Sequence, residues 1–441
     1  MAMRKAALKN SKPLIEKLKQ QPDRTSEDGW HHYNCKLVTP MYGGGVEAGK
    51  VDMSMPIRAA SIRGQLRFWW RVACGRLDPP QDMFKREVAI WGGLGGDKPT
   101  ASKVTVLINE MAKPEVEPAF IYERKPDNVY KAMPKAATWA EAYALFSARG
   151  KLDGSKRVIE TQPAELALAN LGFTLRVKCS ESLSDAQKGE VEKTLRWFAS
   201  FGGVGARTRR GVGAVWFNDP LLKPVLKEEV EAAGGALLTL KALTNAQDAW
   251  HQAVAKLKEF RQGPGLGRNG STSSPGRSLW PEADAIRKLS GRFCNRHDSV
   301  LIPGEVFPRA AFGLPLVFHF MDEHHGCPAD HILEPANISA NKKRDRMASP
   351  LILRPYWDGT HWRPAALLLP VWQSALKQSL KFKDQTYVNA PESWPKDDPD
   401  RRTKAADIKP MQTATGKLRV DDPVSGPDPL SAFMQFFSGG P

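Results

Sequence analysis

The chain has 441 residues, long enough for two or three domains of about 150 residues each, and 41% of them are hydrophobic. The 64 lysine and arginine residues outnumber the 48 acidic ones, and the resulting net charge of +16 favours polyanionic partners. The sequence has no apolar run of membrane-spanning length and no secretory leader, and its five scattered cysteines lack a C-x-x-C pair, which argues against a disulfide framework and a zinc module. We therefore expect a cytoplasmic protein without membrane contact.

The N-terminal third begins with a strand over residues 34–40 and a glycine-rich loop over 41–46. Ser61 is expected to cap a helix over 62–75. The apolar residues of this helix recur at helical spacing and predict a face that packs into a core; they are Leu66, Trp69, Trp70 and Ala73.

A strand over 103–109 comes next, and the alternating segment 172–179 predicts another. Ser184 and Gln187 form a capping-box signature that opens a second helix, and 211–217 reads as a further strand. The resulting order is β-α-β-β-α-β, the split-βαβ or ferredoxin-like order that RNA-recognition modules also use. We expect a helical insertion at about 110–170, centred on Ala137 to Ala148.

The second half predicts a similar unit, with a helix over 246–260 and strands near 314–320, 351–356 and 365–369. The predicted fold class is therefore α+β, with tandem ferredoxin-like (RRM-like) domains that carry helical and loop insertions. The expected divisions are an N-terminal extension (1–29), a first domain (30–222), a second domain (223–381) and a C-terminal tail (382–441). The tail is poor in apolar clusters and predicts partial disorder, although its segment 430–437 is apolar enough to dock.

Arginines form a stripe along the first predicted helix. Arg63, Arg67 and Arg71 are four residues apart and share one face, about 100° from the tryptophans. Arg58 and Arg76 flank the stripe, and no acidic residue lies between them. Because surface helices usually mix charges in i,i+4 pairs, the stripe favours a polyanionic partner over a merely solvated face.

A glycine-arginine loop over 202–213 follows the second predicted helix. A dinucleotide fingerprint leads from a strand into a helix, whereas this loop leads from a helix into a strand, which argues against a nucleotide-binding enzyme. Glycines such as Gly203 and Gly205 allow the backbone to approach a phosphate chain closely. Arginines supply charge and planes that stack on bases; they are Arg207, Arg209 and Arg210. The alternative is a helix C-cap followed by a solvated basic turn.

Three segments carry a family resemblance: Thr39-Pro-Met-Tyr-Gly-Gly-Gly45, Ile57-Arg-Ala-Ala-Ser-Ile-Arg-Gly-Gln-Leu-Arg-Phe-Trp-Trp-Arg71 and Phe201-Gly-Gly-Val-Gly-Ala-Arg-Thr-Arg-Arg-Gly211. They resemble the RAMP superfamily, and in particular the large two-domain RAMP subunits of type III-B (Cmr) CRISPR effector complexes. The resemblance extends through 310–315 and 345–355, and it covers neither the insertion nor the tail.

The resemblance implies a non-catalytic, RNA-binding subunit of a ribonucleoprotein that serves antiviral defence. Its partners would be CRISPR RNA, held near its 3′ end, complementary single-stranded target RNA and other RAMP subunits. The residues carried over to RNA binding are Arg58, Arg63, Arg67, Arg71, Arg207, Arg209 and Arg210. A further basic run is suggested by charge alone and is equally compatible with a charged loop; it comprises Lys342, Lys343 and Arg344.

Catalysis and cofactors are not expected. His31 and His32 could serve a metal-independent RAMP endoribonuclease that processes CRISPR transcripts, but no partner residue is evident. The histidines and cysteines around 322–331, with Cys294 and His297 upstream, lack a zinc-like pattern, and the polar-loop interpretation is favoured.

Overall fold

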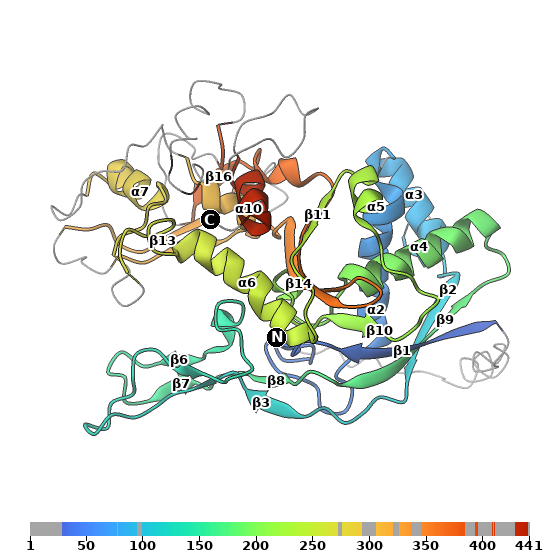
Figure 1. Ribbon diagram of the computed structural model, residues 1–441, viewed down its shortest axis with the longest axis horizontal. Coiled ribbons are helices and arrows are strands. Elements are labelled where there is room, and N and C mark those ends of the chain that lie inside the picture. Colours follow the sequence, from blue (N-terminus) through green and yellow to red (C-terminus); the bar gives the residue numbers. More distant parts are fainter. Residues whose placement is uncertain are drawn as a thin grey trace, which may run out of the picture.

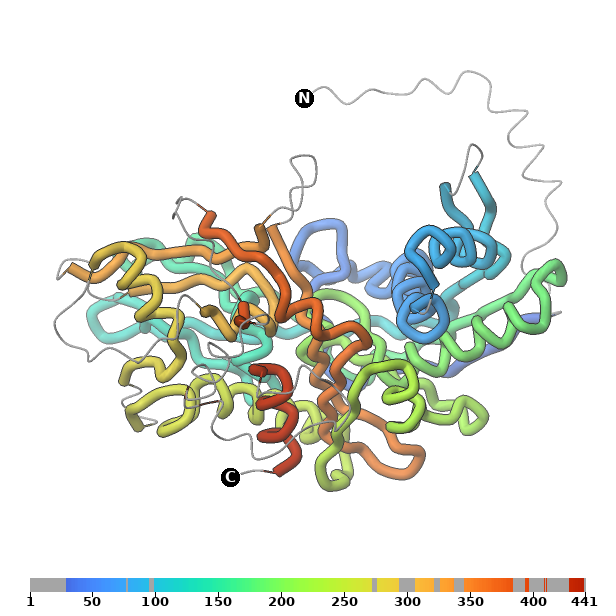
Figure 2. The backbone as a smooth tube through the Cα atoms, turned by 90° about the horizontal axis from the view of Figure 1, so that it is seen from above, coloured from blue at the N-terminus to red at the C-terminus, as the bar shows by residue number. Residues whose placement is uncertain are grey.

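The computed structural model describes residues 29–76, 78–94, 99–271, 276–292, 306–320, 326–336, 345–383, 393–395, 408, 410 and 428–439. Figures 1 and 2 show the chain in two perpendicular views. In Figure 1 the four-stranded sheet lies at one end with α3 (Pro80–Trp91), α4 (Asp185–Phe201) and α5 (Lys227–Ala232), and α7 (Glu282–Ser290) and β13 (His331–Pro335) of the second half lie at the other end.

The first half forms an antiparallel sheet in the order β10-β1-β9-β2. Its strands are β1 (Trp30–Leu37), β2 (Val104–Asn109), β9 (Gly172–Cys179) and β10 (Val215–Phe217). Helix α2 (Ala59–Trp70) lies between the first two strands in sequence, and α4 (Asp185–Phe201) lies between the last two. The connectivity is therefore the predicted β-α-β-β-α-β, with the sheet order 4-1-3-2.

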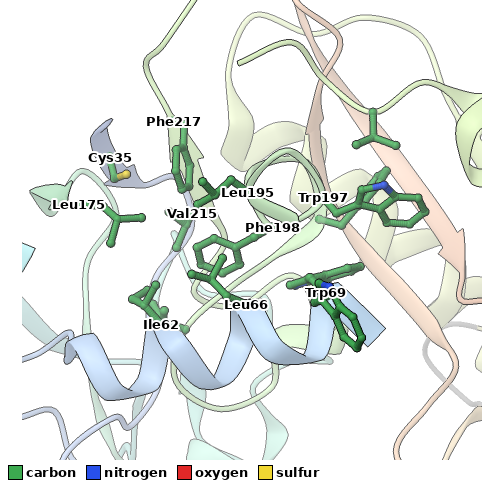
Figure 3. Close-up of a cluster of buried hydrophobic side chains, with 14 of the residues drawn as sticks. Cys35, Ile62, Leu66, Trp69, Leu175, Leu195, Trp197, Phe198, Val215 and Phe217 are labelled. Carbon is green, nitrogen blue, oxygen red and sulfur yellow. The ribbon is translucent and has the colours of Figure 1, made fainter. Parts of the chain in front are cut away.

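Helices α2 and α4 pack on one face of this sheet and on each other (Figure 3). Ile62, Leu66 and Trp69 point from α2 toward Trp197 and Phe198 of α4 and toward the inward residues of the strands. The Trp69 and Trp197 ring centroids are 6.2 Å apart. The predicted apolar face of α2 is confirmed.

The N-termini of α2 and α4 are capped differently. Ser184 caps α4 in the predicted capping box with Gln187. Helix α2 begins two residues before the predicted cap, so Ser61 lies inside it, and its N-cap is Arg58, whose side chain caps nothing. From Arg71 to Gly75 the helix continues as a π-helix (η1).

The insertion is made of short strands, and the prediction of a helical insertion is wrong. Alanine-rich residues 137–148 contain only a short 3-10 helix, η2 (Phe146–Ala148), because packing against Val212 and Trp250 overrides the local helix propensity. The strands are β3 (Val116–Pro118), β4 (Phe120–Ile121), β5 (Lys135–Ala136), β6 (Lys151–Leu152), β7 (Ile159–Thr161) and β8 (Glu165–Ala167). They pair as β3-β8, β4-β5 and β6-β7. Figure 1 shows β6 and β7 in an arm that reaches away from the sheet.

The second half contains two three-stranded sheets. One has the order β11-β15-β14, from β11 (Ala236–Thr239), β14 (Leu351–Trp357) and β15 (Trp362–Leu368). The other is formed by β12 (Leu316–Phe318), β13 (His331–Pro335) and β16 (Leu380–Phe382). Between these strands run α5 (Lys227–Ala232), α6 (Ala246–Gln262), α7 (Glu282–Ser290) and the short η4 (Pro308–Phe312) and η6 (Trp372–Ala375).

The sheet β11-β15-β14 contains part of a ferredoxin-like arrangement. Strand β11, helix α6 and strands β14 and β15 occur in the order β-α-β-β, with α7, η4, β12 and β13 inserted between α6 and β14. The sheet order is 1-3-2, and α6 packs on β14 and β15. Within the described residues no fourth strand joins this sheet. The tandem ferredoxin-like arrangement therefore stays a prediction.

One hydrophobic core spans both halves of the chain. Phe201 of α4 stacks on Tyr356 of β14 with ring centroids 5.8 Å apart. Arg354, only 2% exposed, donates to the carbonyl oxygens of Gly202 at 2.5 Å and Val215 at 3.1 Å. A second core receives the C-terminal helix α10 (Pro429–Ser438), whose phenylalanines pack on α6, so the docking predicted for 430–437 is confirmed.

Candidate nucleic-acid interface

The arginine stripe of α2 is partly neutralised within the chain. Arg63 is exposed, and Glu87 binds the other two arginines. Nε of Arg67 donates to the carboxylate at 2.6 Å, and Arg71 donates through Nε at 2.6 Å and a terminal nitrogen at 2.7 Å. The expectation that no carboxylate pairs with the stripe is thus wrong for Arg67 and Arg71.

Glu87 lies on α3 (Pro80–Trp91), a helix that was not predicted from the sequence. Its side chain is 1% exposed, while those of Arg67 and Arg71 are 26% and 45% exposed. The two arginines lower the pKa of Glu87 by hydrogen bonding, against an opposing effect of burial. A signal for α3 is present in Pro80 at the first turn and in the apolar spacing of Val88 and Trp91.

The outcome is a fixed orientation of the guanidinium groups. A carboxylate that receives several N–H bonds holds both side chains in place, and each still has donors that Glu87 does not occupy. The partial exposure of Arg67 and Arg71 leaves these groups accessible from solvent.

Three segments distant in sequence meet at the start of α2. The glycine-rich loop joins the glycine-arginine loop through a bridge between Tyr42 and Ala206, whose N–H donates to the Tyr42 carbonyl at 2.8 Å. The Arg58 guanidinium hydrogen-bonds to the carbonyl oxygen of Gly44. The helix terminus therefore lies beside the glycine-rich loop, which in turn pairs with the glycine-arginine loop.

The first turn of α2 has neither a side-chain cap nor an acidic residue. Backbone N–H groups of a first turn, together with the helix dipole, create a positive potential that favours anions. Arg58 and Arg63 lie at the same end of the helix. This end of α2 is the strongest described candidate for phosphate binding.

Arg207 occupies the left-handed conformation, with φ 63°, at the exposed tip of the glycine-arginine loop. Its Nε donates to Oγ of Ser147 in the insertion at 3.2 Å. Burial of its stem, with the neighbouring positive charge of Arg346, lowers the pKa of Arg207.

Arg209 and Arg210 point into the seam between the halves. Arg209 lies over the Phe68 ring at 4.9 Å and donates to the Ser349 carbonyl at 3.1 Å. Arg210 donates to the carbonyl oxygens of Phe312 and Leu351, both at 3.2 Å. Burial lowers the pKa of each of these two arginines to about 10. These interactions give them a structural role, which was not predicted from the sequence.

The loop glycines also have structural roles. A side chain at Gly205, where φ is 78°, would place its Cβ 2.6 Å from the Tyr42 carbonyl oxygen. One at Gly203 would lie 2.9 Å from the Gly213 carbonyl oxygen. Both glycines permit backbone segments to approach each other closely, and contact with RNA at these positions stays a prediction.

The remaining candidate residues are scattered or outside the described part. Lys342, Lys343 and Arg344 lie outside the described residues, as do Cys294, His297 and residues 322–325. His31 and His32 are exposed neighbours within β1, rather than before it, so they point to opposite faces of the sheet.

No group of three or more potential metal ligands occurs among the residues that the structure describes. Cys35, Cys74 and Cys179 are free, and Cys327 is disulfide-bonded. No helix in the described ranges is long and apolar enough to cross a membrane.

The sheet, the basic helix terminus and the adjoining glycine-rich loops define an α+β protein with a surface suited to nucleic-acid backbones. Residues 34–216 match the family model of the RAMP superfamily. The matched segment includes most of the sheet, α2 and the glycine-arginine loop, and the match confirms the resemblance to the superfamily stated from sequence. A search of curated proteins gives no match.

Solved structures similar to this chain include Cmr1 from Pyrococcus furiosus in its apo form, with 16% identity, coverage of 82% of this chain and 89% of that chain, and a TM-score of 0.36. A chain of a type III-B Cmr-beta complex bound to cognate target RNA has 11% identity, coverage of 86% and 98%, and a TM-score of 0.37. A chain of Cmr-beta bound to target RNA and AMPPnP in the presence of single-stranded DNA has 10% identity, coverage of 92% and 99%, and a TM-score of 0.38.

Proposed function

We propose that the chain is a non-catalytic RNA-binding subunit of a type III-B CRISPR effector complex in the cytoplasm. It holds CRISPR RNA near its 3′ end and helps to engage complementary target RNA in antiviral defence. Its partners are these RNAs and other RAMP subunits. The match to the superfamily supports this proposal at the level of the family, and the basic surface supports it at the level of chemistry.

The observation that carries the proposal is the uncapped start of α2 with Arg58 and Arg63, beside a glycine-rich loop that is bridged to the loop of Arg207. Arginines and backbone N–H groups bind phosphates without reading bases, which suits a protein that holds guides of many sequences. Arg67 and Arg71, oriented by Glu87, extend this surface along the helix.

The exposed arginines provide the test, because they have no carboxylate partner among the described residues. Changing Arg63 and Arg207 to Glu should weaken single-stranded RNA binding and reduce the slope of log K against log salt by about 0.7 for each phosphate that the protein no longer neutralises. Fluorescence anisotropy at several salt concentrations measures both quantities.

The matched control is Lys188→Glu with Lys258→Glu, exposed positions on α4 and α6 with an equal change of net charge. An unchanged slope in the arginine variant, with thermal stability retained, would contradict the proposal.

A RAMP endoribonuclease remains the second candidate, and the observation that favours it is the exposure of His31 and His32 on β1. Purified protein incubated with repeat RNA in EDTA decides between the two. Specific cleavage that disappears when both histidines are changed to Ala would replace the non-catalytic proposal.

A further inference from the structure

The face of the first sheet opposite α2 and α4 carries a row of cationic, aromatic and polar side chains. Register places these outward residues side by side across the strands: Lys36 beside Trp216, Asn34 beside Thr174, His32 beside Arg176 and Trp30 beside Lys178. Strand β2 adds Thr105, Leu107 and Asn109. None of these outward positions on the four strands is acidic. The residues that alternate with them and face the core are almost all apolar.

Two cation–aromatic pairs mark the ends of this row along β1. The Lys36 ammonium lies 5.6 Å from the centroid of Trp216. At the other end the Arg176 guanidinium lies over Trp30 at 4.7 Å, and Lys178 lies 5.9 Å from the same ring. Six residues of strand separate the two ends, a length of about 20 Å.

The Trp216 end continues into the second half of the chain. Trp357 and Trp362, which face each other across the β14-β15 hairpin, lie 5.9 and 5.8 Å from Trp216. All three rings are partly exposed. Three clustered tryptophans beside a lysine combine flat faces for stacking with a positive charge.

At the centre of the row the β1 residues are accessible, whereas Thr174 and Arg176 of β9 are buried. Asn34 and His32 are exposed, and Lys36, Lys178 and Trp216 are partly exposed. Arg176 and Trp30 are nearly buried and serve to hold that end in place. Just beyond β2, the carboxylate of Glu110 accepts from the Thr174 hydroxyl at 2.7 Å.

We propose that this outward face, from Trp216 along β1 to Lys178, is a second binding surface for single-stranded RNA. Bases stack on the tryptophan cluster, and phosphates lie near Lys36 and Lys178. The charge favours a polyanion over an apolar protein segment, and a four-stranded sheet of this topology with aromatic and basic residues on its open face is suited to unpaired bases. The inference rests on the proposed RNA-binding function, but it concerns a surface separated from α2 by the thickness of the sheet.

The variant Asn34→Glu with Lys36→Glu tests the surface, since neither side chain is buried. We expect about tenfold weaker binding of a long oligouridylate at constant salt, because two carboxylates replace a cation and a neutral group along the phosphate path. The control is Gly189→Glu with Lys188→Glu, exposed positions on α4 with the same change of charge, where binding should change by less than about twofold.

Photo-crosslinking gives a second readout that does not depend on a variant. An oligouridylate that carries 5-iodouracil should crosslink to peptides that contain Trp216, Trp357 or Trp362 of the unmodified protein, as identified by mass spectrometry. Crosslinks confined to the segments 41–71 and 202–211 would overturn the inference.

The two proposals fail in different ways. If the Arg63 and Arg207 variant loses RNA while the sheet variant binds normally, the second surface is absent and the proposed function stands. If the sheet variant retains RNA but no longer assembles with a purified protein partner, the face is a protein-docking surface and the inference is wrong. If neither variant affects binding, both proposals fall.

Discussion

The arginines of α2 and those of the glycine-arginine loop look alike in sequence but have different surroundings. Arg67 and Arg71 bind one buried carboxylate and remain partly exposed. Arg209 and Arg210 lie in the seam between the halves, where backbone carbonyl oxygens accept hydrogen bonds from their guanidinium groups. A basic run therefore does not reveal whether it faces a ligand or the protein itself, because the deciding partners come from distant segments.

The largest expected effect concerns the seam. Arg354→Met removes the buried guanidinium hydrogen bonds to the Gly202 and Val215 carbonyl oxygens, and we expect a loss of unfolding free energy on the order of 3–5 kcal/mol. Urea denaturation measures this loss. Lys131→Met, which removes an exposed ion pair with Glu123, should cost less than about 1 kcal/mol. A similar small cost for Arg354→Met would show that the seam does not depend on its buried arginine.

The next effect concerns the carboxylate beneath the stripe. Glu87→Gln keeps the shape of the side chain but removes its charge, and we expect a loss of about 1–3 kcal/mol in unfolding free energy at neutral pH. RNA affinity should also fall, although the variant is more positive, because Arg67 and Arg71 lose their fixed orientation. An increase in affinity would show that Glu87 merely neutralises the stripe.

The stabilisation by Glu87 should depend on pH in one direction. Its pKa in the folded protein is lowered, so its contribution is complete above the unfolded value of about 4.3 and disappears as the pH falls through the folded pKa. The stabilities of the wild type and Glu87→Gln should therefore converge in acid. A difference that persists below the folded pKa would contradict this linkage.

The smallest expected effect comes from Gly64, an exposed glycine of α2 whose added Cβ would meet no neighbour within 4 Å. Gly64→Ala should stabilise the helix by about 1 kcal/mol and leave RNA binding unchanged. Gly64→Glu adds a negative charge beside Arg63 and should weaken binding several-fold at low salt. Equal RNA affinities of the two variants would place the RNA elsewhere.

Local patterns predicted the elements of the first sheet well. The alternation of 172–179 matches β9, and the capping box at Ser184 forms as expected. Both signals act over a few residues, which is why one sequence suffices to find them. The prediction for the alanine-rich stretch 137–148 was wrong because packing against distant residues such as Val212 and Trp250 overrides local helix propensity.

The candidate site was less predictable than the fold. Glu87 lies 16 residues beyond Arg71 on a separate helix, and only the folded chain brings the two together. The carbonyl groups that bind Arg210 belong to residues more than 100 positions away. Backbone acceptors have no signature in sequence, so the exposure of Arg207 and the burial of its neighbours could not be told apart.

The shared core has a consequence for how the protein is made. Leu367 and Tyr356 complete the core that also contains Trp69 and Phe198, and α10 closes the second core from the C-terminal end. A ribosome must therefore release residues of β14 and β15 before the first sheet and its helices can bury their apolar faces. The nascent chain remains incompletely folded for most of its synthesis, and a fragment that ends at Phe217 should aggregate or require a chaperone.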